Sequence, residues 1–148
     1  MKRWLVLVLW AASLPAAGQS VQANGAWARA TVPGQHATGA FMSLTAPQGA
    51  RLVGAASPVA GLTEIHEMKM QGNVMTMRAV DAVDLPPGRT VQLAPGGYHL
   101  MLMDLQRALV VGEQIRVELR FETRDRRAFT QPIEVEVRRS APAPASAN

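Results

Sequence analysis

The sequence predicts an all-β protein with a single domain, built as a Greek-key β-barrel or sandwich. Short apolar or alternating segments recur along the chain, turn residues separate them, and no segment sustains the helical period of about 3.6 residues. The expected strands cover residues 26–30, 39–45, 51–56, 63–69, 74–78, 90–93, 99–105, 115–122 and 131–138.

The N-terminal segment has the pattern of a secretory signal peptide. Lys2 and Arg3 precede an apolar run of about ten residues, which is too short for a membrane span of roughly twenty. We expect residues 1–23 to be removed by cleavage after Ala23, with cleavage after Gly18 as the alternative. The mature protein is then exported and has no membrane span, and residues 24–139 form the folded domain.

The first three expected strands are separated by the turn signals Pro33-Gly34 and Pro47-Gln48-Gly49. Trp27 and Phe41, in the first two of these strands, are expected to be core aromatics. His36 lies in the connection between them and has no second candidate ligand nearby in the sequence. We therefore expect His36 to be an exposed loop histidine.

The next two strands form a predicted hairpin around Gly72-Asn73, a two-residue turn with glycine in the first position. In this register Met68 lies opposite Met77, and His66 lies diagonal to Met77 on the same face. Directly opposed Cβ atoms are about 5 Å apart and diagonal ones roughly 7 to 8 Å, a gap that long side chains can close around one ion.

The strand at 99–105, which follows the turn region at Pro86-Pro87-Gly88 and the short strand at 90–93, has two different faces. Its period of two places His99, Met101 and Met103 on one side and the intervening leucines on the other. Methionine packs with less definition than leucine, so methionines that share a face with a histidine favour a site at the rim.

The two C-terminal strands, 115–122 and 131–138, alternate between apolar and polar residues, which predicts one buried and one solvated face. The arginine-rich segment 123–128 between them is expected to be a solvated turn. Residues 140–148 have no apolar periodicity and are expected to form a disordered tail.

The composition excludes several classes of function. Basic residues alternate with acidic ones and aromatics make up 5% of the sequence, so a nucleic-acid surface is not expected. The chain has no cysteine, which excludes thiolate metal sites, blue-copper electron transfer and thiol redox chemistry. No histidine lies in a recognisable nucleophile and base arrangement, so we expect no enzymatic activity.

The stretch from His66 to Met103 holds two of the three histidines and six of the eight methionines. Imidazole nitrogens and thioether sulfurs are ligands that suit monovalent copper. His66, Met77, His99 and Met101 are therefore candidate metal ligands. The alternative is that these side chains only pack, and the periodicity by itself does not separate the two interpretations.

The four candidates have the spacing H-x10-M-x21-H-x-M, and they occur with PGGYHLML around His99 and AWARAT at residues 26–31. In these features, and over about residues 24–138, the chain resembles the PCuAC family of periplasmic copper chaperones. The resemblance implies a cupredoxin-like β-fold and one Cu(I) held by His66, Met77, His99 and Met101. It also implies delivery of copper in the periplasm towards the copper site of cytochrome c oxidase, alongside Sco-type proteins.

The chain departs from the family pattern in two places. Glu67 rather than methionine follows His66, so Met68 is offset by one residue. Met68 and Met103 are candidates for contacts that support the ligands, or for an alternative sulfur donor. The tail contains neither His nor Met, which argues against the further Cu(II) site that such extensions provide in some relatives. The main alternative function is an exported β-sandwich interaction module without metal transfer.

Overall fold

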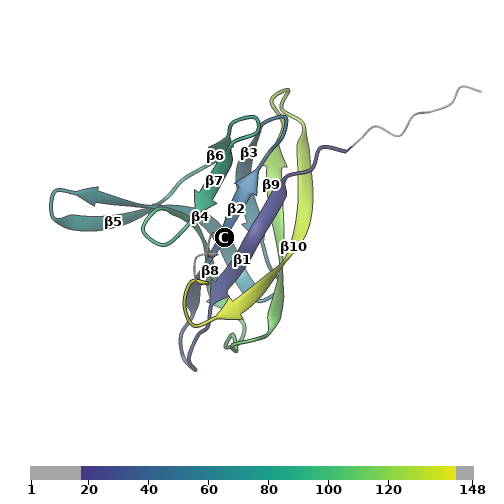
Figure 1. Ribbon diagram of the computed structural model, residues 1–148. Helices are drawn as coiled ribbons and strands as arrows, with labels where there is room; N and C mark the ends of the chain where they lie inside the picture. Colours follow the sequence, from purple (N-terminus) through teal and green to yellow (C-terminus); the bar gives the residue numbers. More distant parts are fainter. Residues whose placement is uncertain (1–17, 143–148) are drawn as a thin grey trace, which may run out of the picture.

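The computed structural model of the protein describes residues 18–142, and this part consists of strands and connecting turns (Figure 1). No helix within these residues is long and apolar enough to cross a membrane. The strands are β1 (Gln22–Arg29), β2 (Ala37–Thr45), β3 (Ala50–Ala56), β4 (Ala60–Gln71), β5 (Val74–Ala79), β6 (Val83–Leu85), β7 (Thr90–Leu93), β8 (Tyr98–Leu105), β9 (Gln114–Glu122) and β10 (Ala128–Arg138).

The prediction of an all-β domain is confirmed, and all nine expected strands are present. β7 has the expected bounds, whereas the ends of the other strands differ by up to four residues. The strand that the sequence did not predict is β6, which has three residues and ends just before Pro86. A segment this short cannot show the alternation from which a strand is predicted.

The strands follow the order β5-β4-β8-β2-β1-β10-β9-β3-β6, and β7 pairs with β2. Neighbouring strands are antiparallel, except that β1 and β10 run parallel. The terminal strands of this order, β5 and β6, do not pair with each other, so the described sheet is open rather than closed into a barrel. It folds over on itself as a sandwich in which β2, β4 and β8 face β3, β9 and β10.

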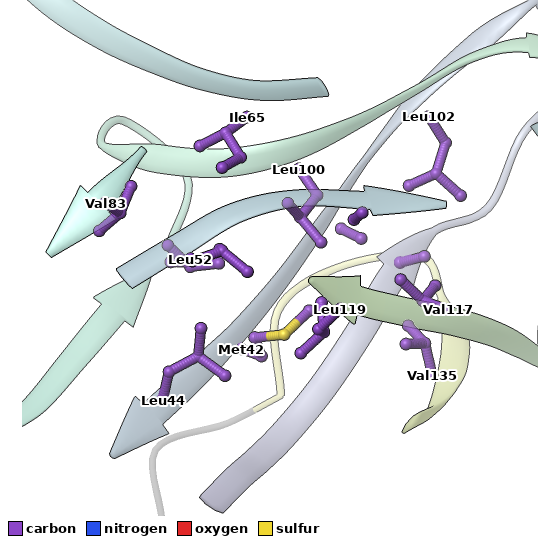
Figure 2. Packing of buried hydrophobic residues seen from close by; sticks show 14 of the residues in the cluster. Met42, Leu44, Leu52, Ile65, Val83, Leu100, Leu102, Val117, Leu119 and Val135 are labelled. Carbon is purple, nitrogen blue, oxygen red and sulfur yellow. The ribbon is translucent and has the colours of Figure 1, made fainter. Parts of the chain in front are cut away.

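The core lies between these two layers, where aliphatic side chains from both sides point toward one another (Figure 2). The labelled members are all at most 4% exposed: Met42, Leu44, Leu52, Ile65, Val83, Leu100, Leu102, Val117, Leu119 and Val135. Burial of each such side chain contributes about 1.5 to 3 kcal/mol relative to exposure. This packing fixes which residues of β4 and β8 point inward, and therefore which residues point outward.

The β4–β5 hairpin extends beyond the sandwich and is seen at the left of Figure 1. β4 pairs with β8 from Ala60 to Glu67, but beyond that its only neighbouring strand is β5. Gly72 has a positive φ of 62°, as a two-residue hairpin turn with glycine first requires. Met68 is paired with Met77 and Met70 with Met75, so the predicted register is confirmed.

The folded part of the chain begins before residue 24, the predicted start of the domain. β1 starts at Gln22, and Val21 is only 3% exposed. The Gln131 side-chain amide donates to the Val21 carbonyl and accepts from its N–H, at 2.6 and 3.0 Å. Cleavage after Ala23 removes these contacts and cleavage after Gly18 retains them, so the packing favours the Gly18 position. The cleavage position itself stays a prediction.

The remaining boundary predictions fall mostly on residues that the structure does not describe. Residues 1–17 of the predicted signal peptide and residues 143–148 of the predicted tail lie outside the described part. Residues 139–142 follow β10, are exposed and form no strand.

Candidate metal site

The two faces of β8 differ as its sequence predicts. Leu100 and Leu102 are fully buried and point into the core, whereas Met101 and Met103 on the opposite face are partly exposed. His99 shares the face of the two methionines, yet it is only 4% exposed because neighbouring side chains cover it. The leucines hold the strand in place, and the outward face is free to carry polar and sulfur groups.

His66 of β4 lies directly opposite His99 of β8. Their ring centroids are 5.9 Å apart, and the ring planes are inclined by 57°. Two imidazoles that share one ion, with metal–nitrogen bonds of roughly 2 Å and about 1 Å from ring centre to nitrogen, have centroids about 5 to 6.5 Å apart. The observed separation therefore fits a single ion between the two rings.

The hydrogen bonds of His66 leave one ring nitrogen available. Its Nε2–H donates to a carboxylate oxygen of Glu64 at 2.9 Å, while its Nδ1 is buried and has no hydrogen-bond partner within the described residues. A buried polar atom without a partner costs free energy, and a bound ion supplies a partner. A carboxylate on the far nitrogen is the arrangement that orients metal-binding histidines. Glu64, which the sequence analysis did not identify, is therefore part of the site.

A backbone carbonyl likewise occupies one ring nitrogen of His99 and leaves the other available. Its Nδ1–H donates to the Gly97 carbonyl at 3.1 Å, which leaves the Nε2 lone pair available. Burial lowers the pKa of His99 below 6.5 because it disfavours the imidazolium ion; the hydrogen bond to Gly97 opposes this effect and the charge of His66 adds to it. The neutral imidazole is the form that binds a metal ion.

An aromatic ring lies next to His99, and a second ring packs behind it. The Phe41 ring lies 6.0 Å from the His99 ring and 4.7 Å from the Trp27 ring. Both aromatics are buried, as predicted, but they lie outside the main aliphatic core cluster. Gly39 permits this packing, because a Cβ there would lie 2.8 Å from the Phe41 ring. The aromatic pair therefore limits access of water to His99 from the β1–β2 side.

A cavity of about 230 Å³ opens beside His99. Met101 and Met68 line it together with His99. Two predicted ligands, His99 and Met101, and one predicted supporting residue, Met68, therefore border the same cavity. The other lining residues are Arg29, Gln35, Thr38, Gly39, Phe41, Pro95 and Gly96. Met101 lies opposite Glu64 on β4, next to the histidine pair in the ladder.

The other two methionines of interest lie further out. Met77 is opposite Met68 and diagonal to His66, as predicted, but its side chain is 50% exposed and does not line the cavity beside His99. Its flexible thioether must turn towards His66 before it can share an ion with the histidines. Met103 follows Met101 on the same face of β8 and lies opposite Leu62, four residues along the strand from His99.

The rest of the described structure offers no competing metal site of another kind. Among residues 18–142, no group of three or more His, Asp or Glu side chains is arranged to hold an ion. His36 is exposed in the loop before β2, as predicted. A larger cavity of about 430 Å³ near β6 contains no His or Met, and its Arg51 lies 3.1 Å from an Asp84 carboxylate oxygen.

Comparison with known proteins places this chain in a family. The sequence model of the family described as "Putative lipoprotein LpqE-like" matches residues 21–137. The chain belongs to the LpqE-like family. A relative from Leifsonia xyli subsp. xyli (strain CTCB07), named "Putative lipoprotein Lxx21020", is 35% identical over 136 residues, which cover 86% of this chain and 80% of the relative.

Solved structures similar to this LpqE-like protein are PCuAC domains, so the predicted resemblance to PCuAC proteins and the cupredoxin-like fold are confirmed. The copper-bound PCuAC domain of PmoF2 is 26% identical with a TM-score of 0.62, covering 79% of this chain and 91% of that one. CuI-DR1885 from Deinococcus radiodurans is 32% identical with a TM-score of 0.57, covering 87% and 82%. Both of these relatives carry copper.

Proposed function

We propose that this protein is an exported copper chaperone that binds one Cu(I) through His66, Met77, His99 and Met101. The observation that carries the proposal is the histidine pair: two directly opposed imidazoles 5.9 Å apart, each with one nitrogen hydrogen-bonded and the other available. Met101 on the same face supplies a thioether beside them. The copper-bound relatives support the same cargo.

The oxidation state follows from the ligands. Four neutral ligands leave a site with Cu(I) at a net charge of +1 and one with Cu(II) at +2, and a partly desolvated position disfavours the larger charge. Thioether sulfur also prefers the softer, reduced ion. The site therefore favours Cu(I).

Delivery rather than catalysis is the proposed role of the bound ion. Methionine does not titrate and forms no disulfide, so such a site works in an oxidising compartment, in keeping with export to the periplasm. The acceptor proposed here is the copper site of cytochrome c oxidase, with a Sco-type protein acting in the same route. To test this, the full chain is loaded with one Cu(I) and mixed with each acceptor separately. If copper is transferred to neither acceptor, the assignment is wrong.

Copper binding itself is tested by titration of the purified protein against a chromogenic Cu(I) chelator. We expect competition for one equivalent, and loss of that competition in His66→Ala. The matched control is His36→Ala, which removes an exposed histidine and should leave binding unchanged. If the parent protein does not compete for the first equivalent, the chaperone assignment is wrong and an interaction module without metal transfer is favoured instead.

A further inference from the structure

The part of the β4–β5 hairpin beyond Glu67 presents four methionines on one face. Met68 is paired with Met77 and Met70 with Met75, and directly paired residues of two antiparallel strands lie on the same side of the sheet. We call these four residues the methionine ladder. Its inner end adjoins His66, because the next pair on the same face is His66 with Ala79.

The opposite face of the hairpin is mostly polar, with Val74 as its exposed apolar residue. Glu67 accepts hydrogen bonds from the Arg78 guanidinium at 3.0 and 3.2 Å, and Lys69 is paired with Thr76. The hairpin is therefore amphipathic, although no other strand of the described structure covers its apolar side. Met70 is 56% exposed, Met75 48% and Met77 50%. Packing within residues 18–142 therefore leaves about half of each of these three side chains exposed.

The spacing of the ladder suits a soft ion. Paired Cβ atoms of opposed strand residues are about 4.5 to 5.5 Å apart, and flexible thioether side chains from one pair can converge on a common ion. Successive pairs on one face are about 7 Å apart, so an ion leaving one pair is within reach of sulfur from the next. The exposed faces of β1, β9 and β10 carry no comparable run of sulfur.

We propose that Met70 and Met75 form an outer site for a second soft monovalent ion, and that the ladder passes the ion inward to the histidine pair. Transfer is ligand exchange: a metal–sulfur bond to the outer pair breaks as a bond to Met68 or Met77 forms, and imidazole nitrogen then replaces sulfur. The ion keeps its oxidation state and no electron is transferred. The proposal rests on the proposed function for the inner site, but it adds a separate site and an entry route.

Silver ion is the probe for the outer site, because it is monovalent, soft and does not change oxidation state in air. The full chain is labelled with ¹³C at the methionine methyl groups and titrated with Ag(I). We expect the Met101 methyl signal to shift during the first equivalent and those of Met70 and Met75 during the second. If Met70 and Met75 do not shift by two equivalents while Met101 does, the outer site is wrong and the inner site stands. If no methionine shifts, the proposed function fails as well.

A kinetic comparison tests the entry route. The variant Met70→Leu/Met75→Leu keeps side-chain volume and removes the outer sulfurs, while Val74→Leu alters an exposed residue on the opposite face of the same hairpin. We expect Cu(I) uptake from a chelator to slow on the order of tenfold in the double variant, with inner-site affinity changed less than about twofold. Val74→Leu should match the parent. Equal uptake rates in the double variant and the parent contradict the route.

Discussion

The inner and outer faces of β8 have different roles, although both belong to one strand of eight residues. Leu100 and Leu102 on the inner face are fully buried in a close-packed aliphatic core, whereas His99 and Met101 on the outer face border a cavity. Because strand side chains alternate, the core that fixes the inner face also fixes the direction of the outer one. The positions of the candidate ligands are thus set by residues that contact no ion.

The largest effect is expected from a change to the inner face. Leu100→Ala leaves a cavity in the core and should lower the free energy of unfolding by about 2 to 5 kcal/mol. The matched control is Leu62→Ala, the same change at a 50% exposed position on the outer face of β4, which should cost less than about 1 kcal/mol. Urea denaturation of both variants measures the difference. Similar losses in the two variants would mean that the faces do not differ as the structure indicates.

A change to the outer face should affect copper rather than stability. Met101→Leu conserves volume and removes the sulfur, so Cu(I) affinity should fall on the order of 100-fold while unfolding free energy changes by less than about 1.5 kcal/mol. Met42→Leu, at a 2% exposed core position, is the control for the substitution itself. Competition with a chelator measures the affinity. An unchanged affinity in Met101→Leu removes this residue from the ligand set.

A smaller effect is expected from the residue behind the ligand. Glu64→Ala removes the acceptor of the His66 Nε2–H bond and should weaken Cu(I) binding about tenfold, the lower end of the range for residues that orient metal-binding histidines. Glu64→Gln keeps an acceptor oxygen and should restore part of the loss. The chelator assay applies here too. If Cu(I) affinity is unchanged in both variants, Glu64 does not contribute to binding.

The smallest effect is expected from pH. The pKa of His99 is lowered in the fold, so between pH 6.5 and that lower value the unfolded chain binds more protons than the folded one. The stability of the metal-free protein should therefore decrease as pH falls through this window, and Cu(I) binding should weaken as protons compete for the imidazoles. Urea midpoints and chelator competition at about pH 7.5 and about pH 5.5 test both. Copper affinity that is flat over this range rules out histidine ligands.

Local features of the site could be predicted from the sequence. The register of the β4–β5 hairpin follows from Gly72-Asn73, because a two-residue turn determines which residues face each other across it. The two faces of β8 follow from its alternating leucines. The diagonal placement of His66 and Met77 could be predicted for the same reason.

Contacts between distant segments could not be predicted. That His66 lies directly opposite His99 depends on the pairing of β4 with β8, whose register is set by burial of Ile65 and Leu100 on the inner face rather than by a turn. The role of Glu64 depends on side-chain geometry, although its position two residues before His66 on the same face was a usable signal. Packing of Val21 against Gln131 likewise joins the two ends of the domain.

The parallel pairing of β1 with β10 links the first strand of the sheet to the last. Contacts between segments so far apart along the chain form slowly, because the closure of a long loop must precede them. The β4–β5 hairpin can form early, but the layers are joined through β2, β1 and β10 only after synthesis reaches residue 138. The sandwich can therefore close only once the whole domain is available, whereas the pairing of β4 with β8 that places His66 opposite His99 involves neither β1 nor β10.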